Sequence, residues 1–336
     1  MIQKELYRVG LDEATLSAFS KFDHYLLARV IFQQKDLYTV VSEKGTHSAK
    51  ITGKMMYEAK DFSAYPAVGD WVAIEYGESI SIIHAILPRK SMLERKSAGV
   101  TSVGQIIATN IDYVFICMSL NENYNLRRLE RYLAVVFSSG AIPLVLLTKS
   151  DLTNDVESLF REAQICAPSV TILTSSSIES DGYEQVKNLM QKGKSYAFIG
   201  SSGVGKSTLV NALLGETIME TFDVGKMAKG RHITTSRSLF ITPDEFIIID
   251  TPGMRELQID QADFTSAFAD IETYAESCKF NDCTHTFEPH CAVLKAVEEG
   301  VLSFERLRNF QKMLKEAKHQ EIKQMKASRD RAKARR

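Results

Sequence analysis

The chain has 336 residues, 44% of them hydrophobic and 25% charged, and its formal net charge at pH 7 is −1. This composition is typical of a globular protein with two or three domains, and it excludes collagen-like and largely disordered chains. No run approaches the 18 apolar residues of a membrane span, and the N-terminus lacks an apolar leader core, so we expect a cytoplasmic protein with no membrane partner.

Charge is distributed unevenly along the chain. Residues 305–336 contain 12 Lys or Arg and 4 Asp or Glu, whereas the remaining residues contain 29 basic and 38 acidic side chains. A basic tail on an acidic body favours a polyanionic partner, although a solvated helix without a partner has the same pattern.

The first hundred residues predict an extension and a small barrel. Residues 1–22 form the extension, with one weakly amphipathic helix at 11–19. Short β-like runs separated by turn residues then predict a barrel over 23–100, and an OB-fold fits best. Its strands are expected at 26–32, 37–41, 71–76 and 80–86. Trp71 could stack on a base, but a buried core position is the commoner environment.

From residue 101 the pattern alternates between strands and helices. Continuous apolar strands between helices predict a parallel α/β sheet over 101–262. The strands are expected at 113–119, 143–147, 170–173, 196–199 and 246–250. Residues 263–336 are predicted to form a helical metal-binding domain that ends in the basic helix.

A complete phosphate-binding loop, Gly200-Ser-Ser-Gly-Val-Gly-Lys-Ser207, lies between an apolar strand and a helix. Backbone N–H groups of such a loop surround phosphate oxygens, and the helix N-terminus adds partial positive charge. Lys206 is expected to reach the β- and γ-phosphates and Ser207 to bind Mg²⁺. The predicted nucleotide ligands here are Gly200, Ser201, Ser202, Gly203, Val204, Gly205, Lys206, Ser207 and Thr208.

A base-recognition motif, Thr148-Lys-Ser-Asp151, ends another apolar strand and resembles the N-K-x-D motif of GTPases, with Thr in place of Asn. The Asp151 carboxylate can accept both N1–H and the 2-amino group of guanine, whereas adenine presents an acceptor at N1 and is rejected. The Ser/Thr stretch at 174–177 is predicted to support the base. The predicted base ligands are Thr148, Lys149, Ser150, Asp151, Ser175 and Ser176.

Asp250-Thr-Pro-Gly253 follows an apolar strand, as expected of switch II. Asp250 is predicted in the Mg²⁺ shell, and the Gly253 N–H at the γ-phosphate. The Gly/Thr/basic stretch 226–237 is typical of switch I, where Thr234 is the first choice for Mg²⁺ and γ-phosphate and Thr235 the second.

The residue that positions the attacking water is harder to assign. Met254 follows Gly253, where Ras-like enzymes have a Gln, and an apolar side chain cannot orient water. His232 is the nearest substitute, although a lone loop histidine is more often a surface residue. The predicted catalytic residues are Lys206, His232, Thr234, Asp250 and Gly253.

The order of these motifs is unusual. The base motif at 148–151 precedes the phosphate loop, which precedes switch II, whereas ordinary GTPases have the phosphate loop first. A circular permutation explains this order, because domain termini often lie close enough to be joined. The alternative is a chance match at 148–151 in an adenine-specific enzyme.

Three cysteines and one histidine predict a metal site. Cys278, Cys283, His285 and Cys291 lie within 14 residues, a Cys₃His set that suits one tetrahedral, structural Zn²⁺. His290 is a competing ligand, but it adjoins Cys291, and neighbouring residues rarely converge on one ion.

Together these residues resemble the ribosome small subunit-dependent GTPase A family of circularly permuted GTPases. The likeness extends to Gly69-Asp-Trp-Val72, Leu87-Pro-Arg-Lys90, Asn110-Ile-Asp112 and Gly230-Arg-His-Ile-Thr-Thr235. The resemblance implies a bacterial GTPase that binds GTP or GDP and the small ribosomal subunit during late maturation. We expect the protein to be a monomer. It also implies subunit-stimulated hydrolysis, rRNA contacts by the barrel and zinc domains, and a hydrolytic role for His232. The alternatives are a GTPase switch without an RNA partner and a passive rRNA-binding assembly protein.

Overall fold

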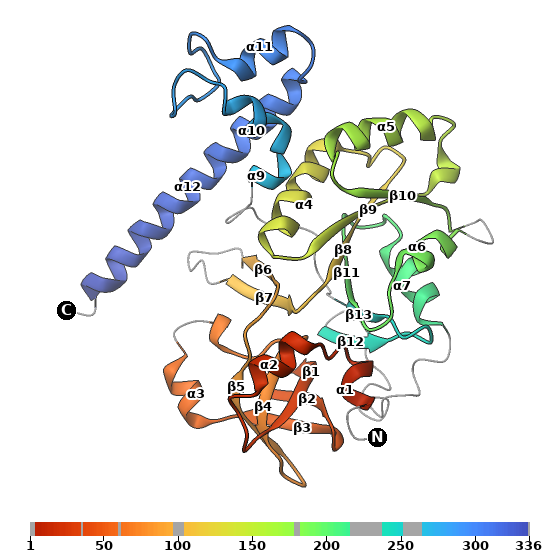
Figure 1. The fold of residues 1–336 in the computed structure, drawn as a ribbon, viewed down its shortest axis with the longest axis vertical. Helices are drawn as coiled ribbons and strands as arrows, with labels where there is room; N and C mark the ends of the chain where they lie inside the picture. The colour runs from red at the N-terminus through yellow and green to blue at the C-terminus, as the bar shows by residue number, and fades with distance from the viewer. Residues whose placement is uncertain are drawn as a thin grey trace. The chain divides into compact units, whose positions relative to one another are not determined.

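The computed structural model describes residues 4–34, 36–59, 62–96, 104–177, 182–215, 237–250 and 264–334. The chain divides into two compact units, residues 1–124 with 139–257 and residues 125–138 with 258–336 (Figure 1). Within the described ranges, every helix is too short or too polar to span a membrane.

A closed barrel forms the N-terminal part of the first unit. Its described strands are β1 (Leu26–Gln34), β2 (Leu37–Ser42), β3 (Gly45–Ile51), β4 (Trp71–Glu75) and β5 (Ser81–Ile86). They follow the order β1-β2-β3-β5-β4, and pairing of β1 with β4 closes the barrel. The predicted small barrel is therefore confirmed, and its architecture is OB-like. Strand β3 was not expected, because Gly-Thr-His-Ser-Ala-Lys-Ile contains no apolar run.

Small and branched side chains fill the barrel. Val30, Val40, Val72 and Ile74 are fully buried, as alternating inward positions on paired strands should be. Trp71 is 4% exposed, so the core interpretation of this residue is confirmed.

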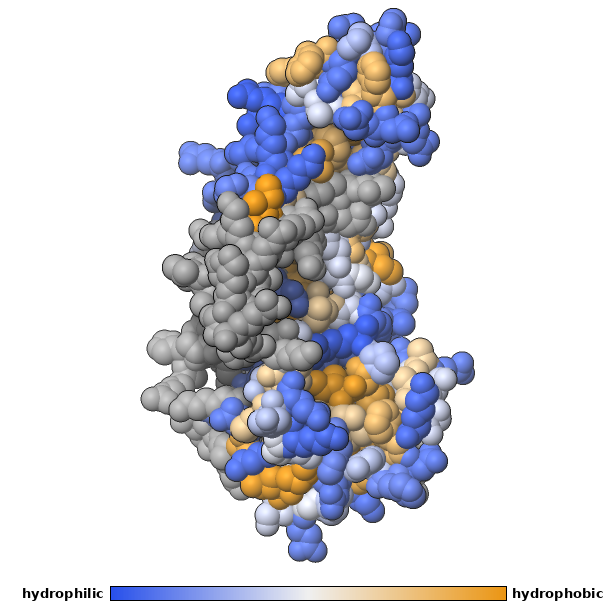
Figure 2. Space-filling view, turned by 90° about the vertical axis from the view of Figure 1, so that its left-hand side faces the viewer, coloured by the Kyte–Doolittle hydropathy of each residue, from blue (hydrophilic) through white to orange (hydrophobic). Residues whose placement is uncertain are grey.

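The barrel also presents large side chains to solvent. Met56 and Tyr57 on α3 (Gly53–Glu58) are 50% and 92% exposed, and Tyr76 after β4 is 47% exposed. On the face drawn in Figure 2, hydrophilic residues cover much of the surface, and hydrophobic residues reach it in the lower part, where the barrel lies.

The predicted parallel sheet is confirmed. Strands β8 (Tyr113–Ser119), β9 (Ile142–Thr148), β10 (Thr171–Ser175), β11 (Ser195–Ile199) and β13 (Ile247–Asp250) pair in parallel in the order β10-β9-β8-β11-β13. The intervening helices of this unit include α5 (Val156–Cys166), α6 (Glu184–Leu189) and α7 (Lys206–Leu214). Phe115, Leu146, Phe198 and Ile248 are among the residues of its core.

Strand β12 (Arg237–Ile241) joins this sheet to the barrel and was not predicted. It pairs antiparallel with β13, and on its other side it pairs antiparallel with β1, with Phe32 opposite Ser238 and Gln33 opposite Arg237. Barrel and α/β sheet thus form one continuous sheet, eleven-stranded in the described residues. A separate hairpin, β6 (Met92–Lys96) and β7 (Gly104–Thr109), lies between barrel and sheet in the sequence.

The N-terminal extension is described from residue 4. It contains α1 (Lys4–Arg8) and α2 (Glu13–Phe19), so the predicted helix is confirmed and begins after its N-cap, Asp12, whose carboxylate accepts the Thr15 N–H at 2.8 Å. Between the helices, Val9 and Leu11 are buried. The part at residues 4–12 is called the N-terminal segment below.

The second unit is helical. It comprises α4 (Leu126–Ser138), α9 (Phe264–Ala267), α10 (Ala269–Ala275), α11 (Ala292–Glu298) and α12 (Phe304–Ala334). By chain order α4 lies between β8 and β9, but its contacts place it in this unit. The domain boundaries predicted at residues 22, 100 and 262 stay a prediction.

A buried arginine connects three of these helices. Arg306 on α12 donates to Glu130 of α4 at 2.5 Å and to both oxygens of Asp270 on α10 at 2.7 Å. Its guanidinium also lies 4.9 Å from the ring centroid of Phe268. Burial raises the pKa of Glu130, an effect that Arg306 opposes. Removal of either partner would leave a buried charge, so this cluster fixes α4 against α10 and α12.

Candidate nucleotide site and metal centre

The phosphate loop is built as the sequence predicts. Strand β11 is buried along its length, the loop follows at Gly200, and α7 begins at Lys206. Gly200 has φ +143°, and a Cβ there would lie 2.2 Å from the carbonyl oxygen of Cys117 on the neighbouring strand. Only glycine can therefore bring the loop this close to β8.

The first turn of α7 can bind an anion. Gly205, its N-cap, has φ +100° and provides no side-chain cap, so the helix N–H groups remain available to a ligand. The Lys206 ammonium donates to the carbonyl oxygens of Gly200 and Ser201, each at 2.7 Å, which holds it over the loop. The side chains of Ser207 and Thr208 are exposed.

The base motif lies against this loop. Strand β9 ends at Thr148, whose hydroxyl donates to the carbonyl oxygen of Val204 at 2.6 Å. Lys149 follows in the left-handed region, φ +58°, and turns the chain into a short 3₁₀ helix, Ser150–Leu152. The threonine that replaces Asn therefore still connects the base motif to the phosphate loop.

The predicted supporting loop lies beside the base motif. Strand β10 pairs with β9 so that Ser175 lies opposite Thr148. The Ser176 hydroxyl donates to a carboxylate oxygen of Asp151 at 2.5 Å, and Ser175 donates to the carbonyl oxygen of Gly182. The structure thus gathers residues 148–151, 175–176 and 200–208 at the carboxyl ends of β9, β10 and β11, where ligands bind to open α/β sheets.

Switch II is described only at its start. Asp250 ends β13, the strand beside β11, so it lies at the same edge of the sheet as the phosphate loop. His232, Thr234, Thr235 and Gly253 lie outside the described residues.

Beneath the loop, Cys117 is an inert part of the core. Burial raises the pKa of its thiol to about 12, and the nearby Lys206 charge opposes this only in part. The thiol therefore stays protonated and acts as a small apolar side chain.

In the second unit, the four predicted metal ligands converge. The ligand atoms of Cys278, Cys283, His285 and Cys291 all lie within 4.8 Å of one another. The Cys278 sulfur is 3.7 Å from His285 Nδ1 and 3.8 Å from the Cys291 sulfur. Donors about 2.3 Å from a tetrahedral ion would be about 3.7 Å apart, so this set fits zinc.

The loop between these ligands is held by Glu288. Its carboxylate accepts backbone N–H groups of Thr284 and Thr286, both at 2.9 Å, and of Phe287 at 3.1 Å. Its pKa is held below the usual range, chiefly by the Thr284 hydroxyl. His285 is further fixed by Gln311, which donates to its carbonyl oxygen at 2.6 Å. The competing His290 is not in the cluster.

Comparison with known proteins identifies the family. A family model described as RsgA GTPase matches residues 86–260, more than half of the chain. The chain belongs to the RsgA GTPase family. It is therefore a GTP-hydrolysing enzyme.

Relatives match almost the whole chain. A Lactiplantibacillus plantarum protein named small ribosomal subunit biogenesis GTPase RsgA 2 is 46% identical over 317 residues, 94% of this chain and 90% of that protein. An Opitutus terrae protein named small ribosomal subunit biogenesis GTPase RsgA is 38% identical over 327 residues, 93% of this chain and 89% of that protein.

Solved structures agree on the fold. YjeQ from Thermotoga maritima has a TM-score of 0.66 at 24% identity and covers 87% of this chain and 98% of its own. YloQ, described as a circularly permuted GTPase, has a TM-score of 0.64 at 24% identity over 89% of this chain and 97% of its own. The permuted GTPase fold predicted from the motif order is confirmed.

Sequence reasoning gave no structural role to several buried polar residues in the barrel and at its junction with the sheet. Asp70 is fully buried and paired with Arg89 by two hydrogen bonds of 2.7 and 2.8 Å, and Arg29 is 1% exposed. Asp70, Arg89, Asn110 and Asp112 were noticed only through the resemblance, and Arg29 was not noticed at all. One available signal was the single arginine inside the apolar run 26–32, because a charge in such a run needs a specific partner.

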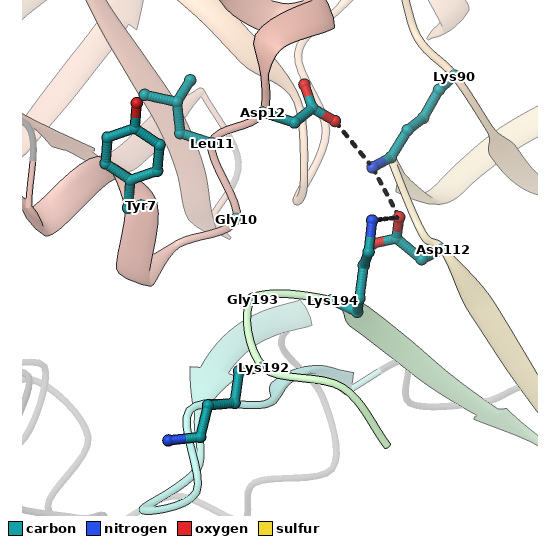
Figure 3. A pocket seen from close by; sticks show the side chains of 9 residues that line it. All are labelled: Tyr7, Gly10, Leu11, Asp12, Lys90, Asp112, Lys192, Gly193 and Lys194. Carbon is teal, nitrogen blue, oxygen red and sulfur yellow. Dashed lines mark hydrogen bonds and ion pairs between the residues drawn. The ribbon is translucent and has the colours of Figure 1, made fainter. Parts of the chain in front are cut away.

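A pocket of about 250 Å³ lies at this junction, between the N-terminal segment and the turn before β11 (Figure 3). Its charged lining residues are Asp12, Lys90, Asp112, Lys192 and Lys194. None of the predicted nucleotide ligands lines it, so it is separate from the nucleotide site.

Proposed function

We propose that this GTPase acts in biogenesis of the small ribosomal subunit, binding the subunit as a late maturation checkpoint that is released after hydrolysis. The observation that carries the proposal is the 46% identity, over 94% of this chain, to a protein named for that process. The subunit stimulates hydrolysis in this proposal, and the protein works as a cytoplasmic monomer.

The described side chains supply guanine selection and phosphate binding. Asp151, oriented by the Ser176 hydroxyl, accepts N1–H and the 2-amino group of guanine. Lys206 exchanges its bonds to the loop carbonyls for phosphate oxygens. Bound Mg²⁺ would be held by Ser207, Asp250 and Thr234 and would neutralise phosphate charge.

The switch residues complete this proposal. The Gly253 N–H contacts the γ-phosphate, and His232 orients the attacking water, with Thr234 or Thr235 closing over the phosphate. Loss of the γ-phosphate releases these contacts, which makes nucleotide state a signal for leaving the subunit.

The remaining parts support rRNA binding. Tyr57 and Tyr76 on the barrel are exposed aromatic side chains on which bases can stack. The tail at 305–336 has a local balance of 12 basic to 4 acidic residues. The Cys₃His cluster holds one structural Zn²⁺, which leaves no open position for catalysis on the ion.

The test is GTP turnover with and without purified small ribosomal subunits, with large subunits as the control particle. The proposal expects clear stimulation by small subunits only, salt-sensitive co-sedimentation with them, and loss of turnover in Lys206→Ala. Arg161→Ala, at an exposed position of α5 outside the parts proposed to bind rRNA, is the matched control and should behave as wild type.

The alternatives give different results. A GTPase without an RNA partner would turn over GTP equally with and without subunits and would not co-sediment. A passive assembly protein would co-sediment but show no turnover in either case. Either result would reject the checkpoint.

A further inference from the structure

Arg29 of strand β1 is a buried charge held by neutral groups. It is 1% exposed, and its guanidinium donates to the carbonyl oxygens of Val9, of Gly69 at 3.2 Å and of Asn110 at 3.2 Å, and to the Ser195 hydroxyl at 3.0 Å. Burial lowers its pKa to about 10, so it is still protonated at neutral pH. A buried cation is unfavourable unless its donors are satisfied, and here four acceptors satisfy four of the five N–H donors.

These four acceptors come from four separate parts of the first unit. Val9 belongs to the N-terminal segment, Gly69 to the barrel, Asn110 to the chain after β7, and Ser195 to the first residue of β11. One planar guanidinium therefore joins the barrel to the strand that leads into the phosphate loop. A lysine could not do this, because its single ammonium cannot reach acceptors spread over a guanidinium fork.

The N-terminal segment is wedged tightly into this junction. Gly10 has φ +84°, and a Cβ there would lie 2.7 Å from an Arg29 nitrogen, 2.8 Å from Ile247 of β13 and 2.9 Å from the carbonyl oxygen of Gly193. Gly10 is therefore in close contact with β1, β13 and the turn before β11, and a larger residue does not fit at this position.

Partly exposed ion pairs border the same junction. Lys90 lies 3.6 Å from Asp12 and 2.9 Å from Asp112, and Lys194 lies 3.6 Å from the same Asp112 oxygen (Figure 3). The other Asp112 oxygen accepts the Ser195 N–H at 2.8 Å. Exposed pairs stabilise weakly, so Arg29 is the stronger connection.

The barrel strand that carries Arg29 also reaches the strands beside both predicted switches. Its residues Phe32 and Gln33 pair with Ser238 and Arg237 of β12, and Arg237 is also the last residue of the predicted switch I stretch. Strand β12 pairs in turn with β13, which ends at Asp250, the start of switch II.

We propose that Arg29 is a positioning residue that fixes the barrel in register with β12 and β11, so that binding on the barrel and the state of the switches influence each other. The inference rests on the proposed function for its physiological direction, from subunit to GTPase. The Arg29 hydrogen bonds, the close packing at Gly10 and the β1–β12 pairing form one continuous set of contacts through which the barrel and the switches can be coupled.

The test compares wild type with Arg29→Lys and Ser195→Ala. We expect the ratio of subunit-stimulated to basal turnover to fall about fivefold or more in Arg29→Lys, within the range that single substitutions produce in coupled systems. Basal kcat and the KM for GTP should stay within about twofold, because Arg29 touches none of the nucleotide ligands. Ser195→Ala removes one acceptor and should give an intermediate ratio. Arg8→Gln, at an exposed position of α1, is the control and should keep the wild-type ratio.

A second measurement is independent of the ribosome. Hydrogen exchange of β1 and β12 amides in wild type should differ between GDP and a non-hydrolysable GTP analogue, and Arg29→Lys should lose the difference in β1. If wild type shows stimulation and Arg29→Lys keeps the full ratio, the inference is wrong while the proposed function stands. If subunits do not stimulate wild type, the proposed function fails, and the exchange experiment still decides the inference. Absence of a nucleotide-dependent difference in β1 of wild type would overturn it. Should Arg29→Lys not fold, Ser195→Ala is subjected to both measurements.

Discussion

The hydroxyl of Thr148 connects the base motif to the phosphate loop, and we predict that Thr148→Val weakens guanine nucleotide binding. The hydroxyl donates to the carbonyl oxygen of Val204 at 2.6 Å, and Val204 is fully buried. Valine has nearly the same shape, so the substitution removes the donor without opening a cavity.

The expected loss of affinity depends on whether the Val204 carbonyl oxygen still has a hydrogen-bond donor. An unsatisfied buried acceptor costs about 1–3 kcal/mol. In the nucleotide-free protein Ser202 and Gly203 are exposed. The loop can therefore relax, and water can then reach the Val204 carbonyl oxygen. A bound nucleotide fixes the loop, so the cost falls on binding. We expect the Kd for GDP to rise about tenfold, equivalent to about 1.4 kcal/mol.

The assay is a fluorescence titration with a labelled guanine nucleotide, combined with thermal unfolding of the nucleotide-free protein. The Tm should change by no more than about 2–4 °C, the shift expected for 1 kcal/mol in a domain of this size. Thr148→Ser keeps the hydroxyl and should restore affinity, and Thr171→Val, at an exposed strand position, is the control. A Kd within twofold of wild type, together with a lower Tm, would show that the hydroxyl stabilises the fold only.

Three further predictions concern the base, the metal and a buried thiol. Asp151→Asn should weaken GTP binding at least about 100-fold and allow hydrolysis of xanthosine triphosphate, whose C2 carbonyl accepts from the new amide; unchanged GTP affinity in competition titrations would exclude Asp151 as the base ligand. Cys283→Ser should lower the zinc content well below one ion per chain and reduce the Tm, because a structural ion contributes folding energy; one full equivalent of zinc, measured after denaturation, would contradict the predicted ligand set. Cys117 has its pKa raised from 9.0 to about 12, so the unfolded state ionises first and the free energy of unfolding should fall as pH rises from 9 towards 12. Urea unfolding at pH 8, 9 and 10 should show that the free energy of unfolding falls less steeply with pH in Cys117→Ala than in wild type. Identical pH slopes in the two proteins would refute this.

The nucleotide and metal sites were predictable because their chemistry fixes residue types over short spacings. A phosphate loop needs glycines where the backbone approaches anions, as Gly200 shows, and a Cys₃His cluster places four ligands within one loop. The strand preceding the phosphate loop was predictable for a related reason, since a strand buried on both faces is a continuous apolar run.

Pairings between distant segments were not predictable in the same way. Strand β12 has only three consecutive apolar residues after Arg237 and Ser238, and β3 is mostly polar, so neither has the long apolar run of a buried strand. Both are stabilised by hydrogen bonds to partners far along the chain, which local patterns do not encode. The role of Arg29 has the same origin, because its four acceptors are separated from it by 20 to 166 residues in the sequence.

The permuted order gives these long-range pairings a physical consequence. Strand β13, which ends at Asp250, lies between β11, which feeds the phosphate loop, and β12, which pairs with the barrel. A displacement of the barrel that passes along the strand pairings therefore needs to cross only one strand to reach the start of switch II, and two to reach the strand before the phosphate loop. Packed strands shift as units because interiors are dense and do not deform continuously. An N-terminal barrel attached at this edge is thus placed to influence the switches more directly than it influences the base motif, which lies at the opposite side of β11. Substitutions at the junction should accordingly alter hydrolysis and its stimulation more than they alter guanine affinity.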